Sequence, residues 1–398
     1  MTTEGALDAK EDTFESMMAI AEDHVAAPEI PRARAKQYSR SRLTVGVLRL
    51  VLAFAFLVLF LTSGASDRLH SFFGGVTDNF YLQLSGYLLA FTAIYYLFFL
   101  GLDFYADVVL ERRYGLSNQT VARWLGRSAK QGALSALIVL PVFDPLYLVI
   151  RRFPHHWWLL ASVGWFILMI AASKITPAVI LPLFYKLHPL EDRELVDRLF
   201  ALAKRCGVRI RQVFEIRLSR ETKKANAAVV GLGRNRKIVI GDTLLDMCSH
   251  DEIEAVFAHE LGHVALHHAW KMLTLAAASS VAAFYLLHLF FERSTAWFGF
   301  GGAHDIAAFP LLLLWLGLLG LVFKPLQAAY SRHIEKQADL FIFGRIEKPD
   351  SLVSALTKLA DRNLADPQPN RWVEWFFYDH PPIAKRIAYL QRSNDKQR

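Results

Sequence analysis

The chain has 398 residues, is 54% hydrophobic and carries a formal net charge of +8. Its apolar residues gather in runs of about 20 residues with few charges, which is the length that crosses a bilayer and argues against an ordinary soluble protein. The positive charge does not indicate nucleic-acid binding, because cytoplasmic loops of membrane proteins carry excess Lys and Arg and no DNA- or RNA-binding motif accompanies the charge.

Six hydrophobic runs predict six transmembrane helices. Residues 1–42 form a polar arm without a cleavable signal peptide, because the apolar run 17–21 is short and is followed by acidic residues. The first span therefore also serves as the targeting signal. A short polar loop is expected at about 64–78. In chain order, the predicted spans cover about 43–63, 81–102, 131–150, 157–182, 270–291 and 306–323.

Two mostly polar stretches accompany these spans. The tail, 324–398, is basic and reads as helices separated by two proline-containing breaks. The stretch 183–269 shows periodicities of both helices and strands, which indicates a small α+β unit. Its patterns predict, in order, a helix at about 191–205, a strand at about 213–218 and a hairpin made of 226–231 and 237–241.

His259, Glu260 and His263 form an H-E-x-x-H motif. Residues i and i+4 share one face of an α-helix, so both imidazoles can bind one metal ion, and Glu260, about 100° away, can act as general base. Zinc hydrolases combine two such histidines with a third ligand and an open position for water. Ser249 and Glu252 form a capping-box pattern, which favours this reading over a surface helix that happens to carry two histidines. The helix is expected to run straight into the fifth span.

The distribution of charge predicts the orientation in the membrane. The N-terminal arm, the loop 103–130, the stretch 183–269 and the tail are rich in Lys and Arg. With six spans all four lie on one side, which the positive-inside rule makes cytoplasmic. The pair Arg151 and Arg152 lies on the other side, against the rule.

This topology also predicts where the third ligand lies. The fifth span starts just after His263 and the sixth returns to the cytoplasmic side, so the ligand should follow the sixth span closely. Glu335 is found there, and Asp339, one turn later, can hold a ligand histidine by its other ring nitrogen. The alternative is a charged, solvated helix surface, since Arg332 and Lys336 lie among these residues.

Several further segments carry the pattern of a known family. Besides the H-E-x-x-H motif they are Arg113 to Thr120, Leu181 to Leu190, Asn226 with Ala227, Lys237 to Leu245, and the E-x-x-x-D element of Glu335 and Asp339. On these segments the chain resembles, across about 30–398, the integral-membrane zinc metalloproteases of the gluzincin type known as type I CAAX prenyl proteases. The resemblance implies a zinc metalloendopeptidase with one Zn²⁺ per chain.

The resemblance implies further roles. His380 and Arg386 match a family pair that contacts the substrate or the tetrahedral oxyanion; the alternative is that His380 caps a turn and Arg386 meets lipid phosphate. Asn226 lies on an expected edge strand, where a peptide can add backbone hydrogen bonds. The water-filled chamber of the family would accommodate Lys174 and Asp144, for which a buried ion pair is the alternative.

Two features depart from the family. Eukaryotic members have seven spans where this chain has six, and 227–229 is small and apolar where those members carry aromatics. A membrane-protein quality-control protease is therefore the second hypothesis, and a transporter or scaffold with an inert metal site is the third. Cys206 and Cys248 form no C-x-x-C pattern and are expected to be free thiols.

These patterns predict a mainly α, polytopic membrane protein with about six transmembrane helices and a small α+β, zincin-like catalytic domain on the cytoplasmic side. We expect both termini in the cytoplasm, and the inner membrane of a bacterium or the endoplasmic reticulum of a eukaryote as location. The expected partners are the lipid bilayer and a peptide or protein substrate, prenylated or membrane-inserted, but not nucleic acid. The predicted parts are the polar arm (1–42), a four-helix membrane region (43–182), a metallopeptidase region (183–269), two membrane helices (270–325) and a cytoplasmic C-terminal part (326–398).

Overall fold

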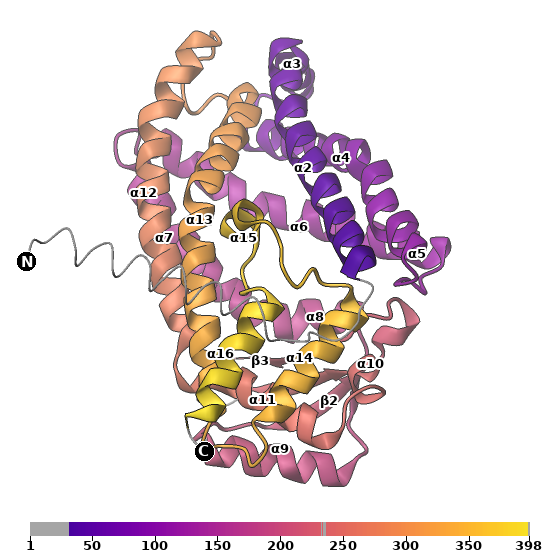
Figure 1. Ribbon diagram of the computed structural model, residues 1–398. Coiled ribbons are helices and arrows are strands. Elements are labelled where there is room, and N and C mark those ends of the chain that lie inside the picture. Colours follow the sequence, from indigo (N-terminus) through magenta and orange to yellow (C-terminus); the bar gives the residue numbers. More distant parts are fainter. Residues whose placement is uncertain (1–31, 232, 234–235, 397–398) are drawn as a thin grey trace, which may run out of the picture.

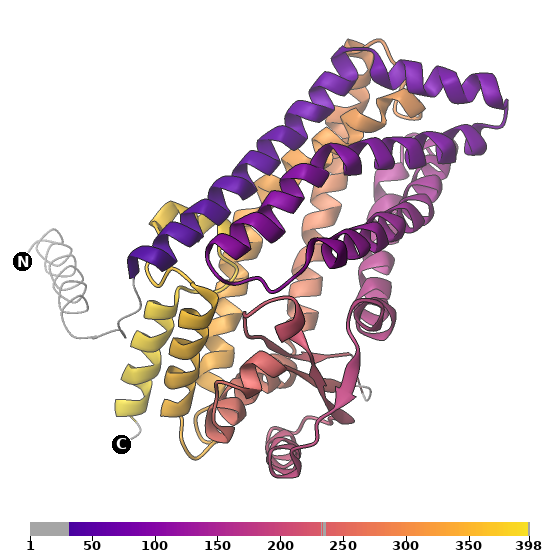
Figure 2. The same cartoon turned by 90° about the vertical axis from the view of Figure 1, so that its right-hand side faces the viewer.

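Long helices stand together in one half of the protein, and a smaller unit of helices and strands lies at one end of them (Figure 1). The structure is a computed structural model that describes residues 32–396, except 232 and 234–235. The predicted arm 1–42 falls mostly outside these residues, and its described part, from Arg32, is already helical. Figure 2 shows the smaller unit from a second side, below the helices.

Among the described residues, six helices are long and apolar enough to cross a membrane, which agrees with the predicted number. They extend beyond the predicted spans, because a helix continues past its apolar run wherever the flanking polar residues keep their backbone hydrogen bonds. They are α2 (Arg32–Thr62), α4 (Phe80–Phe104) with the π-helical turn η1 (Tyr105–Leu110) and α5 (Glu111–Arg113), α6 (Val121–Arg152), α7 (Trp157–Ile175) with η2 (Thr176–Ile180) and α8 (Leu181–Phe184), α12 (His268–Trp297), and α13 (Phe309–Phe341), which follows the turn η5 (Ile306–Ala308).

The predicted loop between the first two spans is wrong, because α3 (Ala65–Val76) forms there. Gly64 precedes it with φ of +69°, a conformation that glycine adopts without strain. Ser66 is fully buried at the first turn, where its hydroxyl donates to the carbonyl of Ala307 at 2.6 Å. Tertiary contacts of this kind stabilise a short helix that the local sequence pattern does not reveal.

The smaller unit contains a four-stranded mixed sheet in the order β1-β2-β4-β3. Its strands are β1 (Leu187–Pro189), β2 (Gln212–Ile216), β3 (Ala227–Val230) and β4 (Lys237–Gly241). The predicted hairpin is confirmed, since β3 and β4 pair antiparallel with Ala228 opposite Val239. The central strands β2 and β4 run parallel, and β3 lies at the edge.

One hydrophobic core joins the two polar stretches that the membrane helices separate in sequence. The core takes residues from 195–261 and from 342–390, including Phe257 and Leu356. The five-part division stays a prediction, while the structure packs both stretches into one unit, which corresponds to the expected catalytic domain and is named the catalytic unit. Its helices are α9 (Arg193–Arg205), α10 (Asp242–Leu245), α11 (His250–Ala265), α14 (Asp350–Asn363), α15 (Arg371–Phe377) and α16 (Ile383–Asp395), with the turn η3 (Leu218–Arg220) beside the sheet.

The loop 113–120 ties the membrane helices to the catalytic unit. Asn118 lies outside the helices. Its backbone N–H donates to the carbonyl of Glu221 at 2.9 Å, and its side-chain amide donates to the carbonyl of Ser219 at 2.8 Å. The N–H of Lys223 donates to Leu116 at 2.8 Å. These bonds fix the segment that leads into β3.

The predicted continuous passage from the motif helix into the fifth span is wrong. Helix α11 ends at Ala265, and His267 adopts a left-handed conformation with φ of 59° before α12 begins at His268. A left-handed residue cannot continue an α-helix, so the chain turns here. The turn places His268 back against the end of α11, 3.0 Å from a ring nitrogen of His263.

The two ionisable residues within the spans do not pair with each other. Oδ2 of Asp144 accepts from the hydroxyl of Ser85 at 3.0 Å, while Lys174 is exposed on the surface of the protein. The alternative of a buried Lys–Asp pair is therefore wrong. The cysteines Cys206 and Cys248 are free thiols, as predicted.

Candidate active site

Helix α11 begins with the predicted capping box. The N–H of Ser249 donates to Glu252 at 2.7 Å, and the side chain of Ser249 accepts from the N–H of Glu252. Glu252 also accepts from Ser354 at 2.5 Å and from Lys358 at 2.7 Å on α14. Burial raises the pKa of Glu252, but these hydrogen bonds, led by Lys358, outweigh it and lower the pKa. The start of α11 is thus fixed to α14.

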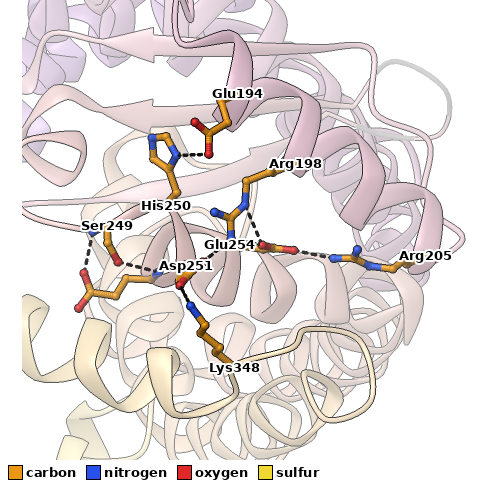
Figure 3. Close-up of polar contacts among 9 residues, drawn as sticks. Glu194, Arg198, Arg205, Ser249, His250, Asp251, Glu254 and Lys348 are labelled. Atoms are coloured by element: carbon orange, nitrogen blue, oxygen red, sulfur yellow. Dashed lines mark hydrogen bonds and ion pairs between the residues drawn. The ribbon is translucent and has the colours of Figure 1, made fainter.

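A network of charges holds α11 to α9 and to the loop before α14 (Figure 3). Arg198 donates to Glu254 at 2.6 Å and also binds Asp251. Arg205 meets the second oxygen of Glu254 at 2.5 Å, and Lys348 meets Asp251 at 2.6 Å. Arg198, followed by Lys348, lowers the pKa of Asp251 to about 2. The network fixes the direction of the helix that carries the motif histidines.

Helices α11 and α13 bring His259, His263 and Glu335 together in a candidate metal-binding cluster, whose ligand atoms all lie within 4.8 Å of one another. The two Nε2 atoms lie 3.2 Å apart. The carboxylate oxygens of Glu335 lie 3.4 Å from Nε2 of His259 and 3.3 Å from Nε2 of His263. His259 and Glu335 are each only 5% exposed, so these polar groups need partners inside the protein. The third residue therefore lies where the helix topology predicts it.

The spacing of the three side chains fits a small tetrahedral cation. A tetrahedral ion about 2.0–2.2 Å from nitrogen and oxygen ligands holds neighbouring ligand atoms about 3.3–3.6 Å apart, close to the 3.2–3.4 Å observed. In addition, Oε2 of Glu335 is buried without a hydrogen-bond partner in the described part of the chain. A buried carboxylate oxygen with a free lone pair is suited to coordinate a metal.

Gly262 allows the two ligand-bearing helices to approach closely. A Cβ atom at this position would lie 3.1 Å from Cβ and Cδ1 of Phe341 on α13. A side chain at this position therefore requires Phe341 on α13 to move by a few tenths of an ångström, at the contact that sets the spacing of the two ligand-bearing helices. The glycine interrupts a run of good helix formers, which is the sequence signal for this close contact.

Behind His259 lies a second layer of buried polar groups. Oδ1 of Asp339 is 2.8 Å from Nδ1 of His259. Arg386 donates through Nε at 2.8 Å and through Nη2 at 2.5 Å to the two oxygens of Asp339, and the hydroxyl of Tyr389 also donates to this carboxylate. Burial lowers the pKa of His259, but Asp339 and Glu335 outweigh burial and raise it to about 9.

Arg386 is 7% exposed, so the alternative of a contact with lipid phosphate is wrong. Its pKa is raised, since the Asp339 carboxylate outweighs the opposing effect of burial. His380, from the loop before α16, approaches the cluster from the solvent side. Its Nε2 lies 3.3 Å from Oε1 of Glu335, and its side chain is 63% exposed.

Glu260 is half-buried beside the two histidines, and no hydrogen bond or ion pair occupies its carboxylate among the described residues. Asn226 is exposed one residue before the edge strand β3, which packs against α11. Its carbonyl accepts from Gly241 at 2.9 Å, and its side-chain oxygen accepts from the N–H of Ala227 at 2.9 Å. The structure therefore brings a free carboxylate, a metal-binding cluster and an unpaired strand edge into one region.

The helices and the buried cluster define a multi-pass membrane metalloprotease. Residues 189–394 match the model of peptidase family M48, and residues 24–186 match the model described as "CAAX prenyl protease N-terminal, five membrane helices". The chain belongs to peptidase family M48.

The similarity to known proteins extends over most of the chain. The chain is 30% identical to the uncharacterized metalloprotease YhfN of Bacillus subtilis over 91% of this chain and 86% of that protein. It is 29% identical to CAAX prenyl protease 1 of Saccharomyces cerevisiae over 75% of this chain and 70% of that protein. The crystal structure of S. mikatae Ste24p superimposes with a TM-score of 0.83 at 25% identity, covering 97% of both chains.

Proposed function

We propose that this protein is a zinc-dependent endopeptidase that cleaves peptides at the cytoplasmic face of a membrane. The observation that carries the proposal is the buried cluster of His259, His263 and Glu335, whose ligand separations fit a tetrahedral ion. When bound, zinc supplies a Lewis acid for the scissile carbonyl and a water that ionises near neutral pH.

Glu260 acts as the general base in this proposal. Its carboxylate lies on the same helix as both histidines and has no competing partner among the described side chains. It accepts the proton of the attacking water and then delivers it to the leaving amine. A carboxylate held in an ion pair would be a weaker base, so the freedom of Glu260 supports this role.

His380 and Arg386 have different roles in this proposal. His380 is exposed on the solvent side of the cluster, where a ring N–H can donate to the oxyanion of the tetrahedral intermediate. Arg386 donates to Asp339 through two nitrogens. It therefore acts through Asp339, which orients His259, and not directly on the substrate.

The substrate binds in an extended conformation along β3. An edge strand presents unpaired backbone groups, and a peptide added there gains hydrogen bonds that depend little on its side chains. Asn226 marks the start of this edge, and its side-chain amide is free to donate to the added peptide. The Lys- and Arg-rich composition of the catalytic unit supports a cytoplasmic position of the site in this proposal.

We further propose that lipid-anchored peptides are the substrate class, with CAAX-type prenylated peptides as the first candidate. The similarity to CAAX prenyl protease 1 and the position of Glu335 near the end of α13, a candidate membrane span, support this choice. A site near the ends of the membrane helices can receive a peptide whose lipid anchor stays in the bilayer. A quality-control protease would instead act on misfolded membrane proteins without a prenyl requirement.

The Glu260→Gln variant tests the mechanism in purified protein. It should keep its zinc and lose about 10²–10⁴-fold in turnover, because only proton transfer is removed. The matched control is Glu292→Gln. Glu292 is an exposed carboxylate near the end of α12, away from the metal-binding cluster, so this variant should cleave the substrate normally. Retained peptidase activity in Glu260→Gln would refute the assignment of the base.

A comparison of three substrates tests the substrate class. These are a farnesylated CAAX peptide, the same peptide without the lipid, and a misfolded membrane protein, each with and without chelator. The proposal predicts chelator-sensitive cleavage that is fastest for the farnesylated peptide. Equal rates for the first two, or cleavage of the membrane protein alone, would contradict the proposed substrate class but not the peptidase.

A further inference from the structure

A chain of side chains leads away from His263 on the side opposite the metal-binding cluster. Nδ1 of His263 lies 3.0 Å from Nδ1 of His268, at the start of α12. Nε2 of His268 lies 3.0 Å from Oε1 of Gln337 on α13, and Nε2 of Gln337 lies 3.0 Å from Nε2 of His333. The chain therefore runs from the half-buried His263 to the exposed His333, which lies two residues before Glu335.

The middle of this chain is well buried. His268 is 1% exposed, and a buried imidazole is stable only if both nitrogens have partners. The turn at His267 brings His268 to this position, because a continuous helix from α11 to α12 would carry it away from His263. The break between α11 and α12 thus gives the ligand histidine His263 a buried hydrogen-bond partner.

Only one arrangement of protons satisfies the whole chain. His263 directs Nε2 toward the cluster, so its ring proton resides on Nδ1 and is donated to Nδ1 of His268. His268 must then carry its own proton on Nε2, which donates to Oε1 of Gln337. The amide nitrogen of Gln337 donates to His333. Every donor faces an acceptor, and His268 is neutral.

We propose that His268 and Gln337 are positioning residues that fix the tautomer and the ring orientation of His263. They do for His263 what Asp339 does for His259, but without a negative charge. Outer partners of ligand histidines set the direction of the imidazole and its basicity. The charged Asp339 behind His259 and the neutral His268 behind His263 leave the cluster less negative than two carboxylates would. The lower negative charge preserves the Lewis acidity of a bound cation. Helix α13 supplies Glu335, Asp339 and Gln337, and α12 supplies His268.

Zinc affinity measures this role without using catalysis. The inference rests on the proposed zinc site, so purified full-length protein should be titrated against a chromophoric zinc chelator. His268→Phe keeps an aromatic ring, slightly larger than imidazole, but removes the hydrogen bonds, and it should bind zinc about 10–100-fold more weakly. His268→Gln, whose amide oxygen can accept from His263, should retain most of the affinity. The visible spectrum of the cobalt-substituted protein should change in His268→Phe and remain close to wild type in His268→Gln.

His267→Asn is the matched control, because it removes the neighbouring exposed imidazole while asparagine tolerates the left-handed backbone. It should bind zinc like the wild type. Gln337→Met serves as a second test on a partly exposed residue should His268→Phe fail to fold, and it should also weaken zinc binding. Wild-type zinc affinity in either His268→Phe or Gln337→Met, or equal losses in His268→Gln and His268→Phe, would overturn the inference. Absence of zinc binding by the wild type would instead refute the proposed function.

Discussion

The pair of Asp339 and Arg386 offers the sharpest test of how the protein supports its metal-binding histidines. Asp339 is 0% exposed, and two donors of Arg386 contact its oxygens at 2.8 and 2.5 Å. Arg386→Met keeps an unbranched apolar side chain and removes the charged guanidinium group. It leaves a buried carboxylate with only Tyr389 and His259 as partners. Breaking a buried ion pair on one side costs about 3–5 kcal/mol, so we expect a loss of stability of that size.

The double variant Asp339→Asn with Arg386→Met separates charge from packing. Because no uncompensated charge remains, it should recover most of the stability that Arg386→Met loses. It should not recover zinc affinity, since a neutral amide supports His259 more weakly than a carboxylate. Unfolding in detergent and zinc titration measure both effects. A loss below about 1 kcal/mol in Arg386→Met, or no recovery in the double variant, would refute the reasoning.

Two further predictions concern α11. Gly262→Ala forces Phe341 to move by a few tenths of an ångström, and such overpacking costs about 1–3 kcal/mol of stability. Zinc binding should therefore weaken. The control is Gly126→Ala, whose added methyl group meets open space beside α6 and should leave zinc binding unchanged. Normal zinc affinity in Gly262→Ala would contradict the close-packing argument. The pKa of Asp251 is lowered from 3.8 to about 2 by Arg198, so its stabilising contribution is complete above about pH 4 and is lost as the pH falls toward 2. The melting temperature of Asp251→Asn should therefore fall less than that of the wild type between pH 5 and pH 2; parallel curves would disprove this.

Local patterns in the sequence predict much of the fold. Hydrophobic runs identify six spans because the bilayer sets their length, and Ser249 with Glu252 marks the start of α11 because the capping box is a contact within one turn. Glu335 is predictable through topology, since adjacent antiparallel helices return to the same side. These signals need no knowledge of packing.

Local sequence patterns do not predict features that depend on contacts between distant segments. Helix α3 forms because Ser66 reaches Ala307, and the turn at His267 follows from packing of α12 that no local pattern reveals. Tyr389 contacts Asp339, which is 50 residues away in sequence, and Gln337 contacts His268, which is 69 residues away. A doublet such as His267 with His268 can be noticed in the sequence, but only the turn shows which imidazole faces His263.

The central claim is that α11 and α13 hold one metal ion between them, and zinc content tests it most directly. Elemental analysis of the purified protein should give about one zinc per chain in the wild type and in Lys336→Ala, an exposed neighbour on α13. Glu335→Ala should lose zinc on dialysis because one of three protein ligands is gone. Stoichiometric zinc bound with unchanged affinity in Glu335→Ala would contradict the account.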